Sequence, residues 1–199
     1  MLRVAAALAV LVAAACGGGG SPGPATETQA LATSTPGGTA TATPTPSPSP
    51  APQGTTATVE LEKGGSFTIQ LRPDKAPGTV ANFIKKANAG DYDGTTFHRV
   101  VPGFVAQGGD PLSKTDPQRA GTGGGKQPTE LSDLPFVKGA VGIARGGDIK
   151  VSNDAQFYVV LDDAPHLNGA YTNFGTVTSG MDVVLGIRVG DKIKTIRSD

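Results

Sequence analysis

Tryptophan is absent from this chain of 199 residues, cysteine occurs once, at Cys16, and methionine and histidine occur twice each. A single cysteine cannot form a disulfide within the chain. Two histidines without clustered cysteines supply too few ligands for a dedicated zinc site. Neither sign of charge is in excess, because 17 lysines and arginines balance 17 aspartates and glutamates. We therefore expect no metal or other cofactor and no nucleic-acid partner.

The sequence also lacks the motifs of several common enzyme classes. It contains no G-x-S-x-G elbow, so a serine hydrolase would have no nucleophile. The glycine-rich run Gly121–Lys126 departs from the phosphate-binding loop pattern at Ala120 and Gln127, and we interpret it as a flexible loop. Asp162 and Asp163 are adjacent carboxylates in an expected turn, where solvated charge is a simpler interpretation than glycosidase chemistry.

The first fifteen residues have the pattern of a secretory signal peptide. Arg3 precedes the apolar run Val4–Val12, which is too short to span a bilayer, and three alanines then lead to Cys16. Ala-Ala-Ala-Cys resembles a bacterial lipobox, in which the cysteine is lipidated, although Ala13 stands where that motif usually has leucine. We therefore expect residues 1–15 to be removed and Cys16 to anchor the protein to the outer face of the bacterial cell membrane. The alternative is an ordinary signal peptide and a secreted protein.

Residues 16–54 are expected to link this anchor to the folded domain. After Cys16 come four glycines and then mainly threonine, alanine, serine and eight prolines. Such a composition cannot bury a core, and it favours disorder with extended polyproline segments. The simplest role is a tether that holds the domain away from the membrane. A ligand for an SH3-like groove is the alternative.

The folded domain is expected to start near Thr55 with a hairpin. Ala57–Glu62 and Ser66–Leu71 both alternate apolar and polar residues, and Lys63–Gly65 between them can supply positive φ. A helix is predicted over Pro77–Ala89, because apolar residues recur there at i, i+3, i+4 and i+7. Proline suits its first turn and the glycine at position 90 can end it.

Further short apolar runs predict additional strands and one more helix. The strand runs are Thr95–Val101, Phe104–Gln107, Gly139–Ala144, Phe157–Leu161 and Thr172–Val177. A second helix is expected at about Gly180–Arg188, although Gly186 weakens it. With 29 glycines, 16 prolines and only two helices, the pattern indicates a mainly β fold, an antiparallel barrel whose ends are closed by helices.

Five segments in succession carry a resemblance to a known family. In Phe97–Asp110 one arginine, a Pro-Gly turn, a phenylalanine, a valine and a glutamine precede a double glycine. The other segments are Gly121–Gly125, Lys138–Arg145, Ala155–Val160 and Asp162–Gly175. Together they resemble the cyclophilins, which are peptidyl-prolyl cis/trans isomerases, over about Val59 to Lys192. The resemblance implies that residues 55–199 form a closed antiparallel cyclophilin-like barrel of about eight strands, capped by two helices.

The chemistry of such an isomerase is simple to state. Rotation about an X-Pro bond must break amide resonance, a barrier of about 18–20 kcal/mol. In the twisted transition state the proline nitrogen regains a basic lone pair, so a catalyst needs a hydrogen-bond donor there and an apolar slot for the ring. Arg99, whose guanidinium stays protonated, is the candidate donor. The resemblance implies that Gln107 holds this guanidinium in place and that Phe104 belongs to the catalytic set.

We therefore expect isomerisation of X-Pro bonds in exported proteins by a membrane-tethered monomer. The alternative is a proline-peptide-binding module or chaperone that uses the same groove without turnover. The slot is expected to be built by Phe104, Val105, Tyr158 and Leu167, and Gln156 is expected to contact the substrate backbone. The full set of implied substrate-binding residues is Val105, Ala144, Arg145, Gln156, Tyr158, His166, Leu167 and Tyr171.

Several of these positions depart from the usual family pattern. Val105 replaces methionine and Tyr158 replaces phenylalanine, so we expect a shallower floor, a hydroxyl at the rim and weaker activity. His166 stands where many eukaryotic members have a tryptophan that helps to bind cyclosporin, which puts strong inhibitor binding in doubt. Tyr171 replaces a histidine. Arg145 replaces an asparagine whose contact is largely through the backbone.

His98 is next to the candidate donor but is not expected to take part in acid–base catalysis. Adjacent residues of a strand face opposite sides, so His98 and Arg99 should point apart. We interpret His98 as a structural histidine whose hydrogen bonds are satisfied.

Overall fold

The computed structural model describes residues 55–199. The expected signal peptide (1–15), the lipidated Cys16 and the linker (16–54) lie outside the described residues, so these expectations stay predictions. Within 55–199, no helix is long and apolar enough to cross a membrane. The same part of the chain contains no group of three or more His, Cys, Asp or Glu side chains placed to hold a metal ion.

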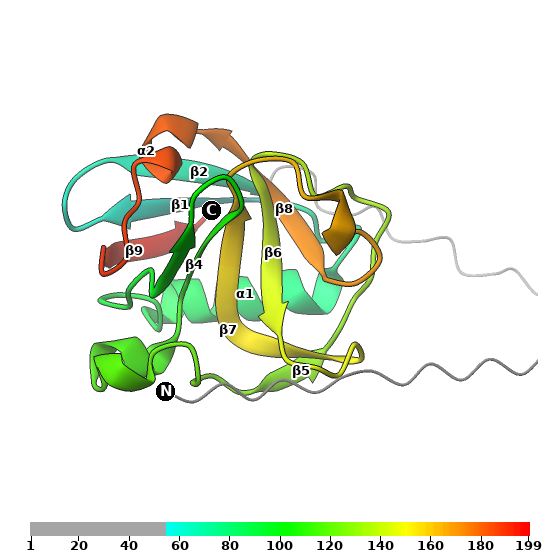
Figure 1. Ribbon diagram of the computed structural model, residues 1–199, viewed down its shortest axis with the longest axis horizontal. Coiled ribbons are helices and arrows are strands. Elements are labelled where there is room, and N and C mark those ends of the chain that lie inside the picture. The colour runs from blue at the N-terminus through cyan, green and yellow to red at the C-terminus, as the bar shows by residue number, and fades with distance from the viewer. Residues whose placement is uncertain (1–54) are drawn as a thin grey trace, which may run out of the picture. The chain divides into compact units, whose positions relative to one another are not determined.

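Strands of the described domain form one antiparallel sheet that curls around a core (Figure 1). Eight of them follow the order β3-β4-β7-β6-β8-β2-β1-β9, and β5 pairs with β7 outside this path. The bounds are β1 Thr56–Leu61, β2 Ser66–Leu71, β3 Arg99–Val101, β4 Val105–Gly108, β5 Lys126–Pro128, β6 Ala140–Arg145, β7 Val151–Val160, β8 Asn173–Ser179 and β9 Ile193–Ser198. The expectation of a mainly β, antiparallel fold is confirmed.

The two edge strands of this path, β3 and β9, meet through a short contact instead of a full ladder. Thr96, three residues before the start of β3, and Lys192, directly before β9, form an isolated antiparallel bridge. Hydrogen bonds of 2.8 Å from Phe97 N to Asp191 O and from Ile193 N to Thr95 O flank the bridge. The curled sheet therefore closes only through this short contact. Elsewhere within residues 55–199 its two edges are not paired, and it has the form of a half-barrel.

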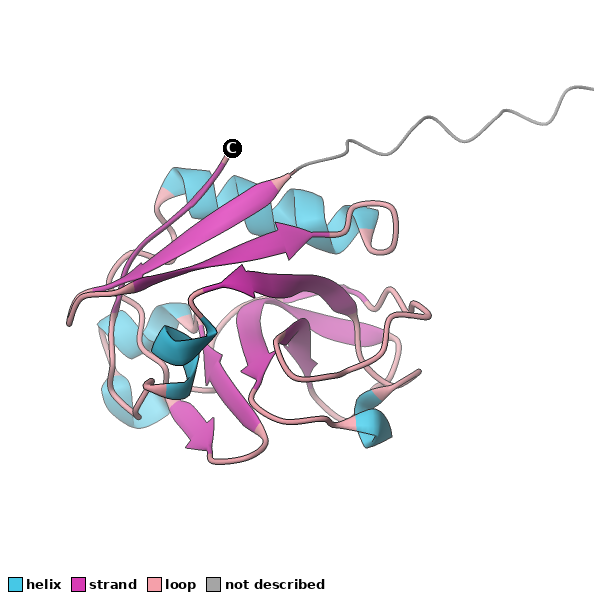
Figure 2. Ribbon diagram, turned by 90° about the horizontal axis from the view of Figure 1, so that it is seen from above, coloured by secondary structure: helices cyan, strands magenta, loops and turns pink. Residues whose placement is uncertain are grey.

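The main helix, α1, spans Pro77–Ala89 as predicted, and it lies along one side of the curled sheet (Figure 2). Gly90 ends it in the left-handed conformation, with φ of 78°. The buried face of α1 packs on an aromatic cluster: the Phe83 ring centroid lies 5.6 Å from that of Phe157 and 5.2 Å from that of Phe174. This packing joins α1 to β7 and β8, the strands on either side of β6.

The second helix is shorter than predicted. α2 spans only Met181–Leu185: Gly180, with φ of 77°, is the residue before its first turn, and Gly186 ends it, as the weakening effect of that glycine indicated. Three short 3-10 helices were not predicted: η1 Pro111–Lys114, η2 Pro117–Arg119 and η3 Pro165–Leu167. Strands β5 and β9 were not predicted either, and β7 begins at Val151, six residues before the expected Phe157.

Two apolar clusters lie on opposite faces of the sheet. Alternation along β7 places Phe157 and Val159 in the main core, and Tyr158 and Val160 in a second cluster. The second cluster consists of Val105, Phe136, Ala140, Tyr158, Val160, Ala164 and Leu167, with Phe104, Ala144 and Tyr171 packed against it. From the sequence, these residues could not be distinguished from the main core. In the structure they form a separate apolar cluster outside the barrel interior.

Candidate active site

Strands β3 and β4 form a hairpin that places Arg99 beside Gln107. The two residues are direct cross-strand partners, and Arg99 Nη1 donates to Gln107 Oε1 at 3.3 Å. The connecting turn is tight, with φ of 70° at Gly103 and a hydrogen bond of 3.0 Å from Phe104 N to Val101 O. The turn thereby brings the Phe104 ring to 5.8 Å from the Arg99 guanidinium carbon.

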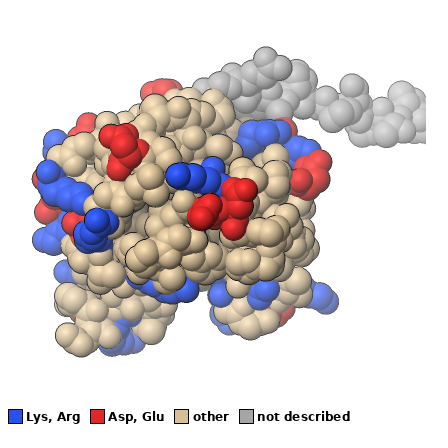
Figure 3. Space-filling view, turned by 45° about the horizontal axis from the view of Figure 1, so that its top comes forward, with Lys and Arg blue, Asp and Glu red and all other residues tan. Residues whose placement is uncertain are grey.

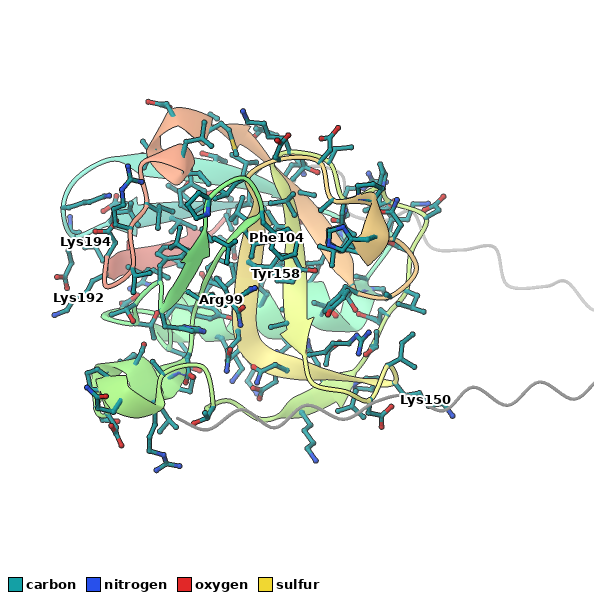
Figure 4. The ribbon with its side chains drawn as sticks, in the orientation of Figure 1. Arg99, Phe104, Lys150, Tyr158, Lys192 and Lys194 are labelled. Atoms are coloured by element: carbon teal, nitrogen blue, oxygen red, sulfur yellow. The ribbon has the colours of Figure 1, made fainter. Side chains whose placement is uncertain are left out.

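A hollow of about 190 Å³ opens next to this hairpin. In Figure 4, Arg99, Phe104 and Tyr158 lie together in front of β4 and β7. The lining residues are Arg99, Phe104, Val105, Gln107, Ala144, Arg145, Tyr158, Leu167 and Tyr171. The structure thus brings together nine of the eleven residues that the sequence analysis proposed for the folded domain. The lining of this hollow combines apolar and aromatic side chains with the polar side chains of Arg99, Gln107 and Arg145.

Tyr158 forms the floor of the hollow and is 5% exposed. Its ring stacks on Phe136, with centroids 6.0 Å apart, and meets the Tyr171 ring edge to face at 6.1 Å. The hydroxyl is buried and has no hydrogen-bond partner among the described residues, which corrects the expectation that it would lie at the rim. Burial raises the pKa of Tyr158 well above its ordinary value, so the hydroxyl stays protonated.

Arg145 forms a wall of the hollow through its side chain. Its Nε donates to Ala170 O at 2.7 Å and its Nη1 to Gly146 O at 2.8 Å. The guanidinium carbon lies 4.4 Å from the centroid of the Tyr171 ring. The expected backbone contact of this position with substrate stays a prediction, and the side chain in addition packs on Tyr171 beside the hollow.

His166 does not line the hollow. It is exposed on η3 and stacks on Phe104, with ring centroids 5.3 Å apart and an interplanar angle of 30°. Its neighbour Leu167, buried at the end of η3, does line the hollow. His166 therefore supports the outer face of Phe104.

Comparison with known proteins identifies the family of this chain. The family model described as cyclophilin type peptidyl-prolyl cis-trans isomerase/CLD matches residues 56–198. Peptidyl-prolyl cis-trans isomerase B of Bacillus subtilis is 45% identical over 141 residues, covering 69% of this chain and 93% of the relative. A peptidyl-prolyl cis-trans isomerase of Synechococcus elongatus is 40% identical over 147 residues, covering 72% and 95%. The chain belongs to the cyclophilin family.

Solved structures give the same fold. A Cryptosporidium parvum cyclophilin type peptidyl-prolyl cis-trans isomerase, determined in the presence of the dipeptide Ala-Pro, superposes with a TM-score of 0.64 at 23% identity, covering 72% of this chain and 98% of that one. Cyclophilin AquaCyp293 from Hirschia baltica gives 0.58 at 24% identity, covering 71% and 72%. Family and relatives together identify this cyclophilin as a peptidyl-prolyl cis-trans isomerase.

Gln156 lies apart from the hollow of this cyclophilin. It is 3% exposed, and both ends of its side-chain amide are hydrogen-bonded within the protein. It borders an adjoining cavity of about 500 Å³, which shares Gln107, Ala144 and Arg145 with the hollow. The expected contact between Gln156 and the substrate backbone stays a prediction. In this structure the side-chain amide is hydrogen-bonded to other residues of the protein.

His98 differs from the sequence interpretation in one respect. Both ring nitrogens are buried and have no hydrogen-bond partner among the described residues, so the histidine is structural but not satisfied. Burial lowers the pKa of His98 below its ordinary value, which keeps the ring neutral near pH 7. The hollow is lined by Arg99 and not by His98, as expected from strand alternation.

Two residues that shape the site were not identified from the sequence. Gly142 on β6 lies directly under the Tyr158 ring, where a Cβ atom would overlap the ring and its hydroxyl. Asp110 is fully buried beneath the hairpin. A carboxylate directly after a double glycine and before Pro111 was the available signal, because such a residue can cap the turn that follows.

The unpartnered hydroxyl of Tyr158 gives a stability prediction. Tyr158→Phe should raise the free energy of unfolding by about 1 kcal/mol, because it removes a buried polar group that lacks a partner. Urea denaturation of the two proteins measures this difference. Tyr171→Phe, which removes a hydroxyl from a half-buried ring of the same hollow, should stay within about 0.5 kcal/mol. A clear loss of stability in Tyr158→Phe would mean that a bound water satisfies the hydroxyl.

Proposed function

We propose that this cyclophilin isomerises X-Pro bonds of exported polypeptides, with Arg99 as the donor to the proline nitrogen. The observation that carries this proposal is the placement of the Arg99 guanidinium at the edge of an apolar hollow. A proline ring seated on Val105 and Tyr158 would bring its nitrogen towards that edge. The donor would meet the lone pair that appears only when the amide twists, so it would stabilise the transition state over the planar ground state.

The surroundings of Arg99 support this role. Gln107 accepts from one guanidinium nitrogen, which restricts the side chain and leaves other N–H groups free to face the hollow. The centroid of the Phe104 ring lies 5.8 Å from the guanidinium carbon, and this apolar ring would help to exclude water and so strengthen the hydrogen bond to substrate. The structure of the Cryptosporidium parvum relative was determined in the presence of Ala-Pro, a ligand of the chemistry that this hollow would accept.

The charge distribution is consistent with a broad range of polypeptide substrates. Basic and acidic side chains both occur on the face shown in Figure 3, with wide uncharged areas between them. Such a surface selects neither acidic nor basic chains strongly, so recognition would rest on proline and on the backbone around it.

A protease-coupled assay with an Ala-Pro-Phe peptide tests the activity against the binding-module alternative. We expect the domain to accelerate cis-to-trans conversion in proportion to its concentration. A module that binds without turnover would leave the slow thermal rate, with its relaxation time of tens to hundreds of seconds, unchanged. That result, obtained together with measurable peptide binding, would replace the proposal by its alternative.

We also propose that Cys16 carries a lipid and that the protein works on the outer face of the cell membrane. The apolar run and Ala-Ala-Ala-Cys support this, since a lipidated cysteine would hold the domain at the membrane through the proline-rich segment. Cys16→Ser should therefore shift the protein from the membrane fraction of bacterial cells to the soluble or secreted fraction. Ser21→Ala, five residues further along, is the matched control and should remain membrane-bound. Equal membrane recovery of the two variants would exclude lipidation.

A further inference from the structure

A line of side-chain hydrogen bonds runs from the edge of the hollow into the protein. Gln107 accepts from Arg99 Nη1 at 3.3 Å, and its own Nε2 donates to Gln156 Oε1 at 3.0 Å. Gln156 Nε2 in turn donates to Asp110 Oδ2 at 3.3 Å and to Gly123 O at 2.8 Å. The line begins at an exposed guanidinium and ends at a carboxylate that is 0% exposed.

The Asp110 carboxylate is fixed firmly at its end of the line. Oδ1 accepts from Leu112 N at 2.8 Å, and Oδ2 accepts from Gly123 N at 2.9 Å and from Gly121 N. With Gln156, four donors therefore meet one carboxylate, one of them at Oδ1 and three at Oδ2. The loop wraps the carboxylate so closely that a Cβ atom at Gly123 would overlap it.

The two ends of the line determine how each amide between them is turned. An ionised carboxylate only accepts hydrogen bonds and a guanidinium only donates them, whereas each glutamine can do either. Asp110 and the Gly123 carbonyl, which both only accept hydrogen bonds, therefore require Gln156 to present its NH2 group inward and its oxygen to Gln107. Gln107 must then donate to that oxygen, which leaves its own oxygen for Arg99. Reversing either amide would place two donors or two acceptors against each other.

We propose that Asp110 is a positioning residue that orients Arg99 through Gln156 and Gln107. It touches no reacting atom, and its effect on turnover rests on the donor role proposed for Arg99. The competing explanation is that Asp110 acts only by folding the loop at Gly121–Gly123, which borders the adjoining cavity. The two explanations differ in whether the effect of Asp110 depends on Gln156.

Asp110→Asn tests the proposal with little change of shape. The asparagine amide has one oxygen and one NH2 group, so its NH2 group must face either Leu112 N or the three donors at the Oδ2 position, and at least one hydrogen bond must be lost. Gln156 is the donor that still has another acceptor, Gly123 O, and we expect it to be released. We expect kcat for an Ala-Pro peptide to fall about 10-fold with KM within about twofold, because misplacing a catalytic group affects mainly the reacting geometry. The Arg99 Nε–Hε signal in NMR spectra should shift or broaden.

Gln156→Met interrupts the line while leaving the three backbone contacts of Asp110 in place. It should lower kcat as much as Asp110→Asn, and the double variant should be no slower than either single variant, within about twofold. If the two reductions of kcat multiply in the double variant, Asp110 and Gln156 act independently. That result would overturn the proposal in favour of the loop explanation. If Asp110→Asn does not fold, Gln156→Met alone still decides, because an unchanged Arg99 signal in it would contradict the proposal.

Ser113→Ala is the matched control for a general loss of stability in the turn at Asp110. The Ser113 hydroxyl donates to the backbone oxygen of Asp110 at 2.6 Å and accepts from Thr96 N at 2.9 Å, so its loss weakens the same turn without touching the side-chain line. This variant should melt earlier and keep kcat and the Arg99 signal. A lowered kcat with an unchanged Arg99 signal in Asp110→Asn would overturn the positioning role. A changed signal with unchanged kcat would instead support the link and refute the donor role of Arg99.

Discussion

Replacing Arg99 by alanine should lower kcat/KM for an Ala-Pro peptide by at least about 100-fold, the loss seen when one preorganised transition-state donor is removed. The side chain is exposed and hydrogen-bonded only to Gln107 among the described residues, so the free energy of unfolding should change by less than about 1 kcal/mol. Binding of a proline peptide should be weakened far less than turnover, because the apolar hollow remains. Coupled-assay kinetics, urea denaturation and peptide titration separate the three effects.

Two further variants make the Arg99 experiment specific. Arg99→Lys should recover little activity, because a single ammonium on a flexible stem does not reproduce a planar group that can bind Gln107 and substrate together. Arg119→Ala removes another exposed arginine, on η2 and outside the hollow, and should keep full activity. If Arg99→Ala retained full turnover, the donor would have to be another group and the proposed mechanism would be wrong.

The elements with regular periodicity could be predicted from the sequence, and those with broken periodicity could not. Strand β2 and helix α1 have the predicted bounds, and β1 lies one residue earlier than predicted. In β9, however, Ile193 and Ile196 both face the core although they are three residues apart, because the pairing with β1 shifts at Glu60 and Leu61. This bulge removes the alternation that would have marked the strand. β5 contains only Lys126–Pro128 and carries no apolar signal at all.

In the candidate site, too, the sequence predicted some features and not others. Phe157, Tyr158, Val159 and Val160 are all apolar, so β7 gives no sign of which face is interior and which carries the hollow. Family resemblance supplied the residues of the hollow, and the structure gathers most of them at one place. It could not supply the contacts that are specific to this chain, such as Arg145 on Tyr171 or the burial of the Tyr158 hydroxyl. These depend on where neighbouring strands lie, which no local pattern encodes.

Gly142→Ala should destabilise the protein and impair catalysis together. The new methyl group would overlap the Tyr158 ring and its hydroxyl, and would lie 2.8 Å from a ring carbon of Phe136. Overpacking of this kind typically lowers stability by about 1–3 kcal/mol. Because Phe136 lies on one side of Tyr158, we expect the Tyr158 ring to be pushed towards the hollow, which would shorten the space for the proline ring. KM for a proline peptide should therefore rise at least about 10-fold.

If the clash with the Tyr158 ring causes the destabilisation by Gly142→Ala, a smaller side chain at position 158 should relieve it. Tyr158→Leu alone removes a floor residue and leaves a cavity, so it should also be destabilising. The loss in free energy of unfolding in the double variant of Gly142→Ala and Tyr158→Leu should be smaller than the sum of the two single losses, by about 1 kcal/mol or more. Gly147→Ala, where a Cβ atom meets nothing within 4 Å, is the control for an added methyl group and should leave stability unchanged. Additive losses in the double variant would mean that Gly142 matters for the strand backbone and not for the ring above it.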